Sequence, residues 1–220
     1  MTDTEEFPDS ADQFEGVLFD WAGTITVPMH EMVTTAASEL GFSSDDLARA
    51  FAGLAEYFLS DNSPIHQAER GQIDDDDLAN FIDEQVPGAS RLLLATDGPS
   101  FLTSADRPEM LGLLEDLRDA DVTVVLATNN FRLAQDLLAT RYLDSGLVSA
   151  IVNSALIGHR KPEPQFYEIA LEAAGVMAHE ALFVDDQTTN LAAARTLGLG
   201  TVLMGDDLAA SISRIRAAVL

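Results

Sequence analysis

The sequence predicts an α/β protein, with a Rossmann-like parallel sheet core and an inserted α-helical cap domain. Five short apolar, β-rich runs occur at residues 16–20, 122–128, 148–152, 181–185 and 200–204. From the second run onward, one helical stretch separates each run from the next, which is typical of a parallel sheet covered on both faces. Roughly 100 residues separate the first two runs, far more than one crossover needs, and most of them have a helical pattern.

The helical stretches of the predicted core lie at residues 108–120, 131–142, 163–175 and 190–198. In the first of these, Met110, Leu113, Leu114 and Leu117 recur at the spacing that places side chains on one face of a helix. We therefore assign residues 16–27 and 104–220 to the core.

Residues 28–103 form the predicted cap. One apolar stripe consists of Met32, Val33, Ala36, Ala37 and Leu40. A second consists of Leu47, Ala50, Phe51, Leu54 and Phe58, and it follows an N-cap-like Ser44-Asp45. Residues 77–86 and 89–95 predict a third and a fourth helix.

The charge balance is strongly acidic, with 12 Lys and Arg against 37 Asp and Glu and a net charge of -25. Such a field repels nucleic acid and anionic membranes, so we expect neither as a partner. Self-repulsion of this size is relieved by molar salt, which favours a halophilic protein over an acidic mesophilic one. We interpret the run Asp74–Asp77 as a solvated face.

Residues 1–15 are acidic and lack an apolar stretch, so we expect a short tail and no targeting signal. No run of 18 apolar residues is present to span a membrane, and there is no Cys for disulfides or thiolate chemistry. We expect a cytoplasmic protein that is a monomer or a homodimer.

Polar residues follow the predicted strands, where open parallel sheets bind their ligands. Asp20 follows the first strand, Thr128 and Asn129 the second, and Asp185 and Asp186 the fourth. Beyond the third lies Lys161, the one Lys in a chain that otherwise uses Arg. A strand-end carboxylate can attack phosphorus, further carboxylates can hold Mg²⁺, and a hydroxyl and an ammonium can stabilise the phosphoryl oxygens.

The chain resembles the haloacid dehalogenase (HAD) superfamily in a combination of four motifs: DWAGT, a Thr after the second strand, KPEP and DDQTTN. The core of that superfamily, the HAD-like Rossmannoid fold, is a Rossmann-like parallel sheet. The resemblance covers the chain from residue 16 on, and its later motifs are similar to those of sugar phosphatases and the phosphatase domain of epoxide hydrolases. It implies a Mg²⁺-dependent phosphatase that acts on a small phosphorylated metabolite through an aspartyl-phosphate.

The resemblance also implies roles for single residues. Asp20 would be the nucleophile, and Thr128 would bind the transferring group. Lys161 would orient the nucleophile and the phosphate. The implied metal ligands are Asp20, the carbonyl of Ala22, Asp186 directly and Asp185 through water. The substrate-binding candidates are Thr128, Asn129, Trp21, Gly23 and His30.

Ala22 departs from the pattern, because phosphatases of this superfamily usually have a second Asp there as acid and base. DWAGT instead resembles phosphonoacetaldehyde hydrolases, but their Schiff-base Lys has no counterpart in this cap. Haloacid dehalogenases also lack the second Asp. They differ from this chain, however, in having no carboxylates for metal binding at the positions of Asp185 and Asp186. A phosphonatase- or dehalogenase-like hydrolase and a non-catalytic relative that binds a phosphorylated ligand remain the alternatives.

Each candidate also has a purely structural interpretation. Asp20 could end a strand, Lys161 could be a surface residue, and the other polar residues of the set could cap helices: Thr128, Asn129, Asp185, Asp186 and Asn190. Trp21 could serve packing alone, and His30 could be a surface or packing residue. In the cap, His66, Arg70 and Arg91 are further candidates for contacts to phosphate or carboxylate.

Overall fold

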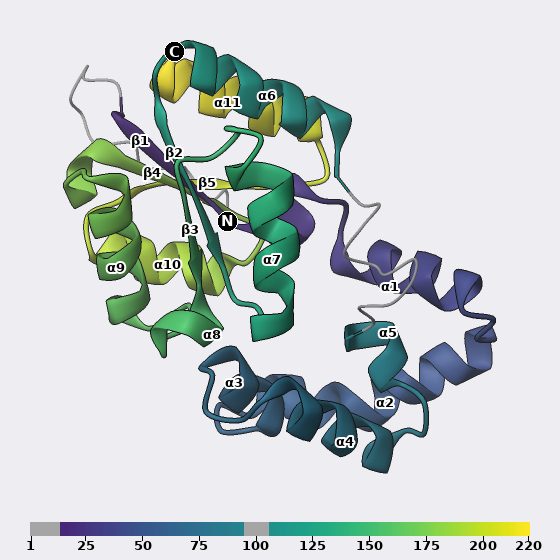
Figure 1. Ribbon diagram of the computed structural model, residues 1–220. Helices are drawn as coiled ribbons and strands as arrows, with labels where there is room; N and C mark the ends of the chain where they lie inside the picture. The colour runs from purple at the N-terminus through teal and green to yellow at the C-terminus, as the bar shows by residue number, and fades with distance from the viewer. Residues whose placement is uncertain (1–13, 95–105) are drawn as a thin grey trace, which may run out of the picture.

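The computed structural model describes residues 14–94 and 106–220 and confirms the predicted parallel sheet (Figure 1). Five parallel strands lie in the order β3-β2-β1-β4-β5. Their bounds are β1 Gly16–Phe19, β2 Thr123–Thr128, β3 Ala150–Asn153, β4 Ala181–Asp185 and β5 Gly200–Leu203. The first strand is therefore central, between β2 and β4.

Helices cover both faces of the sheet because alternate strand residues point to opposite sides. Val17 and Phe19 belong to a cluster with α6 and α11, whereas Leu18 packs with α9 and α10 on the other face. The core helices are α6 Pro108–Asp119, α7 Gln135–Leu138, α8 Ser154–Ile157, α9 Pro164–Ala174, α10 Thr188–Thr196 and α11 Leu208–Val219.

Several core elements differ from the prediction. The third strand begins at Ala150 and not at residue 148, because its ladder with β2 starts at the pair Ala150 and Val125. The single helix predicted over 131–142 is divided into short turns at 132–134 and 139–143 on either side of α7. Helices α8 and α11 were not predicted from the sequence.

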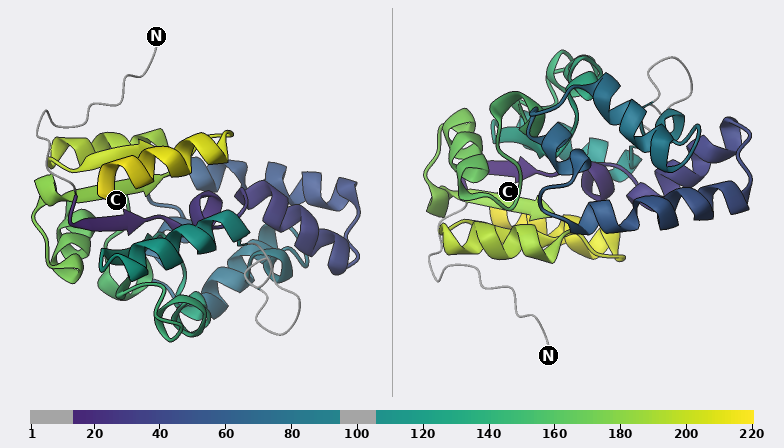
Figure 2. Two further views of the ribbon diagram at one scale, coloured as in Figure 1. Left: turned by 90° about the horizontal axis from the view of Figure 1, so that it is seen from above. Right: turned by 90° about the horizontal axis from the view of Figure 1, so that it is seen from below.

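Within the described part of the chain, five helices form the inserted cap, which stands to one side of the core (Figure 2). They are α1 Met29–Glu39, α2 Ser44–Leu59, α3 Pro64–Glu69, α4 Asp75–Gln85 and α5 Ser90–Leu94. The cap has its own apolar cluster, in which Leu54, Ile65, Leu78 and Ile82 are buried. The prediction of Ser44-Asp45 as N-cap was wrong: Ser43 caps α2 and shares a capping box with Asp46.

The chain enters and leaves the cap at one place. Thr26 and Asp106 form an antiparallel bridge, and the N–H of Arg107 donates to the carbonyl of Ile25 at 3.1 Å. The predicted end of the cap, at residue 103, lies outside the described residues. Most of the predicted tail over 1–15 also lies outside them, but Phe14 is buried and packs against Gly200, so the core begins earlier than expected.

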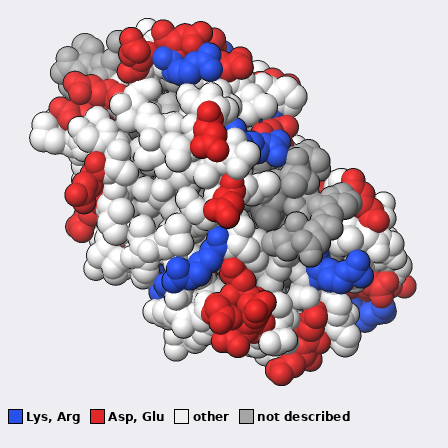
Figure 3. All heavy atoms as spheres, viewed as in Figure 1, with Lys and Arg blue, Asp and Glu red and all other residues white. Residues whose placement is uncertain are grey.

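Acidic side chains are spread over both the core and the cap on the face shown in Figure 3, with fewer basic groups among them. The interpretation of Asp74–Asp77 as a solvated face is wrong for one member. Asp75 accepts a hydrogen bond from the N–H of Leu133 at 2.8 Å and so joins the cap to the core. Among the described helices, none has the length and apolar character needed to cross a membrane.

Candidate active site

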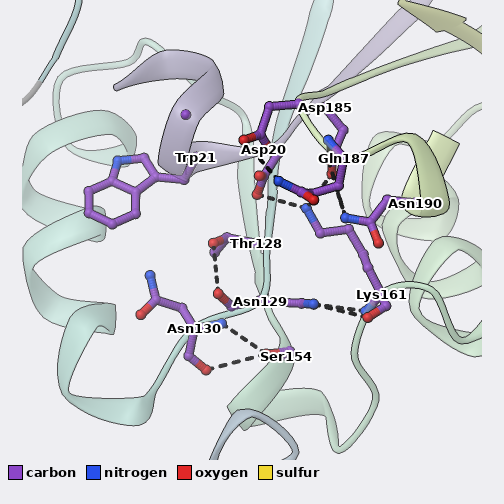
Figure 4. A network of polar contacts seen from close by, with 12 residues as sticks. Asp20, Trp21, Thr128, Asn129, Asn130, Ser154, Lys161, Asp185, Gln187 and Asn190 are labelled. Atoms are coloured by element: carbon purple, nitrogen blue, oxygen red, sulfur yellow. Dashed lines mark hydrogen bonds and ion pairs between the residues drawn. The ribbon is translucent and has the colours of Figure 1, made fainter. Parts of the chain in front are cut away.

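Polar side chains from three adjacent strands meet at the carboxyl edge of the sheet (Figure 4). Asp20 directly follows β1, Thr128 ends β2 and Asp185 ends β4. The N–H of Asp20 donates to the carbonyl of Val184 at 2.9 Å, so the main chain fixes where this carboxylate stands. All three predicted site residues are buried, with exposed fractions of 8% for Asp20, 1% for Thr128 and 0% for Asp185.

Lys161 brings a buried ammonium into this group, which excludes its interpretation as a surface residue. Its Nζ lies 2.7 Å from Oδ1 of Asp20 and 2.8 Å from Oδ2 of Asp185. Its main chain is held by Asn129, whose Nδ2 donates to the Lys161 carbonyl at 3.0 Å and whose Oδ1 accepts from the Lys161 N–H at 2.7 Å. The side chain of Asn129, predicted to bind substrate, therefore positions Lys161.

Asp185 is oriented by two further groups. Nδ2 of Asn190 lies 3.1 Å from Oδ2 of Asp185, and the main-chain N–H of Gln187 donates to Oδ1 at 2.7 Å. Because Asn190 bonds the carboxylate of Asp185, it positions that acid. Asp185 caps no helix, since α10 begins after Gln187 without a side-chain cap.

The charges of the site depend strongly on one another. Burial raises the pKa of Asp20 to about 7, the nearby Lys161 opposes that shift, and the charges of Asp185 and Asp186 add to it. Burial acts to lower the pKa of Lys161, but the carboxylates of Asp185 and Asp20 outweigh it and raise this pKa above its ordinary value. The pKa of Asp186 is raised by burial and by the charge of Asp185.

Three carboxylates could hold a metal ion. Asp20, Asp185 and Asp186 each place one oxygen within 4.8 Å of the others. Gly23 makes room for this cluster, because a Cβ on it would lie 2.5 Å from Oδ2 of Asp186, and its φ of +83° is one that glycine adopts readily. A buried cluster of carboxylate oxygens with one ammonium fits a hard divalent cation such as Mg²⁺.

The remaining substrate-binding candidates, Trp21 and His30, lie in different places. Trp21 is buried, and its Nε1 donates to the hydroxyl of Tyr142 at 2.9 Å, so the indole N–H points away from the site. Trp21 and Ala22 line a cavity between the core and the cap. His30 is exposed and is not one of the residues that line this cavity.

The cap is joined to the loop that carries Lys161 by two crossed ion pairs, which the sequence analysis missed. Glu69 pairs with Arg160, and Arg70 pairs with Glu163, each with an N–O distance of 2.6 Å. The guanidinium of Arg70 therefore binds a core carboxylate, although the sequence made it a candidate for substrate contact. The other two cap candidates are placed differently, since His66 is buried and Arg91 is exposed.

Comparisons with known proteins identify the family and the fold of the chain. A family model described as haloacid dehalogenase-like hydrolase matches residues 14–198. Sesquiterpene phosphatase astK of Aspergillus oryzae is 33% identical over 145 residues, which are 65% of this chain and 73% of the relative. Bifunctional epoxide hydrolase 2 of Rattus norvegicus is 27% identical over 208 residues, which are 87% of this chain and 36% of the relative.

A solved structure shares the fold. It is a HAD family enzyme from Bacteroides thetaiotaomicron in complex with magnesium and inorganic phosphate. The TM-score is 0.66 at 20% identity, and the match covers 88% of this chain and 96% of that one. The chain belongs to the haloacid dehalogenase-like hydrolase family.

Proposed function

We propose that the protein is a Mg²⁺-dependent phosphomonoester hydrolase in which Asp20 forms an aspartyl-phosphate. The observation that carries the proposal is the buried ammonium of Lys161 between the carboxylates of Asp20 and Asp185, with Thr128 at the same sheet edge. The phosphatase name of the Aspergillus relative supports it, as does the magnesium and phosphate complex of the Bacteroides enzyme.

In the first step, a carboxylate oxygen of Asp20 attacks phosphorus and the ester P–O bond breaks, so that the alcohol leaves and takes up a proton. Lys161 holds Asp20 in place and places a positive charge beside the phosphoryl oxygens, while Thr128 supplies a hydroxyl to them. A divalent cation held by Asp20, Asp185, Asp186 and the carbonyl of Ala22 would neutralise the repulsion between carboxylate and phosphate.

In the second step, water hydrolyses the aspartyl-phosphate, which releases inorganic phosphate and restores the Asp20 carboxylate. Ala22 can neither protonate the alcohol nor activate this water. The first step should therefore depend steeply on the pKa of the leaving alcohol, and the second should be slow. Aryl and acyl phosphates should react faster than alkyl phosphates.

Two alternatives compete with this proposal. Ala22 favours a relative that binds a phosphorylated ligand without turnover, but the buried set of Asp20, Lys161 and Asp185 opposes it. The phosphonatase-like alternative needs a cap Lys for its Schiff base, and Lys161 is buried in the core instead. The dehalogenase-like alternative needs no metal ion, so it gives no role to the cluster of Asp20, Asp185 and Asp186.

The decisive assay measures inorganic phosphate released from a panel of phosphomonoesters in about molar KCl with Mg²⁺. Asp20→Asn should reduce turnover by orders of magnitude without unfolding the protein, and Lys161→Arg should also be strongly impaired, since a planar guanidinium replaces a compact charge. The matched control is Asp45→Asn in the exposed first turn of α2, which should leave turnover unchanged. Near-normal phosphate release by Asp20→Asn would overturn the covalent mechanism.

The role of Ala22 is tested by stopped-flow release of p-nitrophenol from its phosphate ester. The natural protein should give a burst followed by a slow steady state, because hydrolysis of the aspartyl-phosphate limits turnover. Ala22→Asp should remove the burst and increase activity on alkyl phosphates. No burst in the natural protein, together with lower activity in Ala22→Asp, would show that another group already acts as acid and base.

A further inference from the structure

A cavity of about 70 Å³ lies between the cap and the carboxyl edge of the sheet, with room for several water molecules. Trp21 and Ala22, which directly follow Asp20, form part of its core wall, and Phe58, Ile65 and Ile82 form part of its cap wall. The cavity therefore adjoins the proposed phosphoryl site. It lies at Ala22, the position at which an Asp would protonate the leaving alcohol. An ester bound to Asp20 would place its alcohol portion there.

The lining of this cavity offers mainly carbon surface. Its polar side chains are Glu69, Asn129 and Asn130, and each already bonds to protein atoms, which leaves Nδ2 of Asn130 as the amide group without a partner among the described residues. Glu69 pairs with Arg160, the amide of Asn129 holds the main chain of Lys161, and Oδ1 of Asn130 accepts from the N–H of Phe131 at 2.9 Å. The one polar hydrogen of the Trp21 ring bonds to Tyr142.

A sugar or a nucleoside would have to bury its hydroxyl groups against these carbon atoms, and buried polar groups without partners are costly. A hydrocarbon chain or ring would instead gain from leaving water. At the cavity lie two large side chains that are partly open to solvent, Met29 with 45% exposed and Phe58 with 41%. Apolar surface therefore continues from the interior toward solvent.

We propose that the preferred substrates are phosphomonoesters of apolar alcohols, with the hydrocarbon portion in the cavity beside Ala22. This inference rests on the proposed function, because it names the alcohol side of the ester that Asp20 attacks. It also gives Ala22 a positive role, since its methyl group completes the apolar wall where a carboxylate would bring a charge.

The first experiment is a competition assay with p-nitrophenyl phosphate as substrate in molar KCl with Mg²⁺. The competitors are linear alkyl phosphates from propyl to octyl, whose alcohols have nearly equal pKa values, together with glucose 6-phosphate. The inhibition constant should fall about threefold for each added methylene group until the cavity is filled. Glucose 6-phosphate should compete at least tenfold more weakly than hexyl phosphate.

The matched variants are Phe58→Ser and Phe51→Ser. Both residues lie on α2 and each is 41% exposed. Phe58 lines both the cavity and a neighbouring hollow, whereas Phe51 lines the hollow but not the cavity. Phe58→Ser should raise the inhibition constant of octyl phosphate about tenfold and leave that of inorganic phosphate unchanged. Phe51→Ser should change neither value.

Equal inhibition along the alkyl series would overturn the inference, as would tighter binding of glucose 6-phosphate or equal effects of the two variants. The absence of phosphate release from every ester would instead overturn the proposed function. In that case, calorimetric binding of the same alkyl phosphates to the Mg²⁺-loaded protein still tests the cavity, with the same dependence on chain length expected.

Discussion

Gly23 leaves open the space that the Asp186 carboxylate occupies. A Cβ at this position would meet the Asp186 carboxylate at 2.5 Å, and the φ of +83° adds strain for any other residue type. Gly175 has a similar φ of +69°, but a Cβ on it would meet nothing within 4 Å. Substitutions at the two positions therefore distinguish the effect of a clash with Asp186 from the effect of backbone strain alone.

We predict that Gly23→Ala weakens Mg²⁺ binding at least tenfold, because the new methyl group displaces the Asp186 carboxylate. Gly175→Ala should cost about 1 kcal/mol of unfolding free energy through strain alone and leave the Mg²⁺ affinity unchanged. Isothermal titration with Mg²⁺ measures the affinity, and thermal unfolding measures the strain. Equal Mg²⁺ affinities in the two variants would contradict this role of Gly23.

The raised pKa of Asp20 predicts how the metal-free protein responds to pH. The folded protein keeps the Asp20 proton up to about pH 7, whereas the unfolded chain releases it near its ordinary value of 3.8. The resulting contribution to stability is fully present below about pH 3.8 and is lost as the pH rises through about 7. Added Mg²⁺ should stabilise the fold more at pH 8 than at pH 6, since its ligands must be deprotonated.

Thermal unfolding in EDTA and constant molar KCl, from pH 5 to pH 9, tests this dependence. The melting temperature of the natural protein should fall with rising pH more steeply than that of Asp20→Asn, which lacks the titrating group. Using the difference between the two proteins removes the general repulsion among the other acids. Parallel curves would show that the pKa of Asp20 is not raised by burial.

At the scale of elements, the ion pairs between the end of α3 and the loop after α8 are one of the contacts that join the cap to the core. Arg160 and Glu163 stand on either side of Lys161 in the sequence, and both are paired with the cap. The position of α3 and the position of the Lys161 ammonium are therefore linked. A change in one ion pair should affect both the stability of the cap contact and the activity.

We predict that a double-mutant cycle with Arg70→Met and Glu163→Gln gives a coupling energy of about 1 kcal/mol, together with reduced turnover. The side chains of this pair are only 18% and 26% exposed, whereas those of the control pair, Arg49 and Asp46, are 67% and 41% exposed. The control cycle should give about 0.3 kcal/mol and unchanged turnover. Urea unfolding at the lowest KCl concentration that keeps the protein folded measures the two coupling energies, and phosphate release measures turnover. Similar coupling energies in the two cycles would contradict the prediction.

The strands and their motifs were predictable because each signal is local: an apolar run ends and a polar residue follows, as at Asp20 and Asp185. The apolar pattern of α11 is also present in the sequence, with Leu208, Ile215 and Val219 on one face, so this helix was predictable although it was not predicted. The short helix α3 has too few residues to show periodicity, although Ser63 before a Pro is a start signal for a helix.

The crossed ion pairs could not be predicted from the sequence. Glu69 lies 91 residues from Arg160, and Arg70 lies 93 residues from Glu163, so their pairing depends on the orientation of the cap. The same holds for Asn129, whose position after a strand predicted a site residue but not a bond to the main chain of Lys161. Local patterns gave the members of the site, while tertiary contacts determined the partner of each.

For the whole molecule, the dominant property is the net charge of -25. Acidic groups face solvent on core and cap alike, so their repulsion opposes folding of both parts (Figure 3). We predict that the protein unfolds on dialysis into dilute buffer and refolds in molar KCl, because salt screens this repulsion. A melting temperature that stays constant between low and molar KCl would contradict the halophilic interpretation.

The bridge between Thr26 and Asp106 has a mechanical consequence for the cap. Both covalent connections between core and cap pass through this one place. A rotation of the cap about the bridge would leave the bridge intact but would separate Arg160 and Glu163 from their partners in the cap. Because these two residues flank Lys161 in the sequence, such a rotation would also change the surroundings of its ammonium.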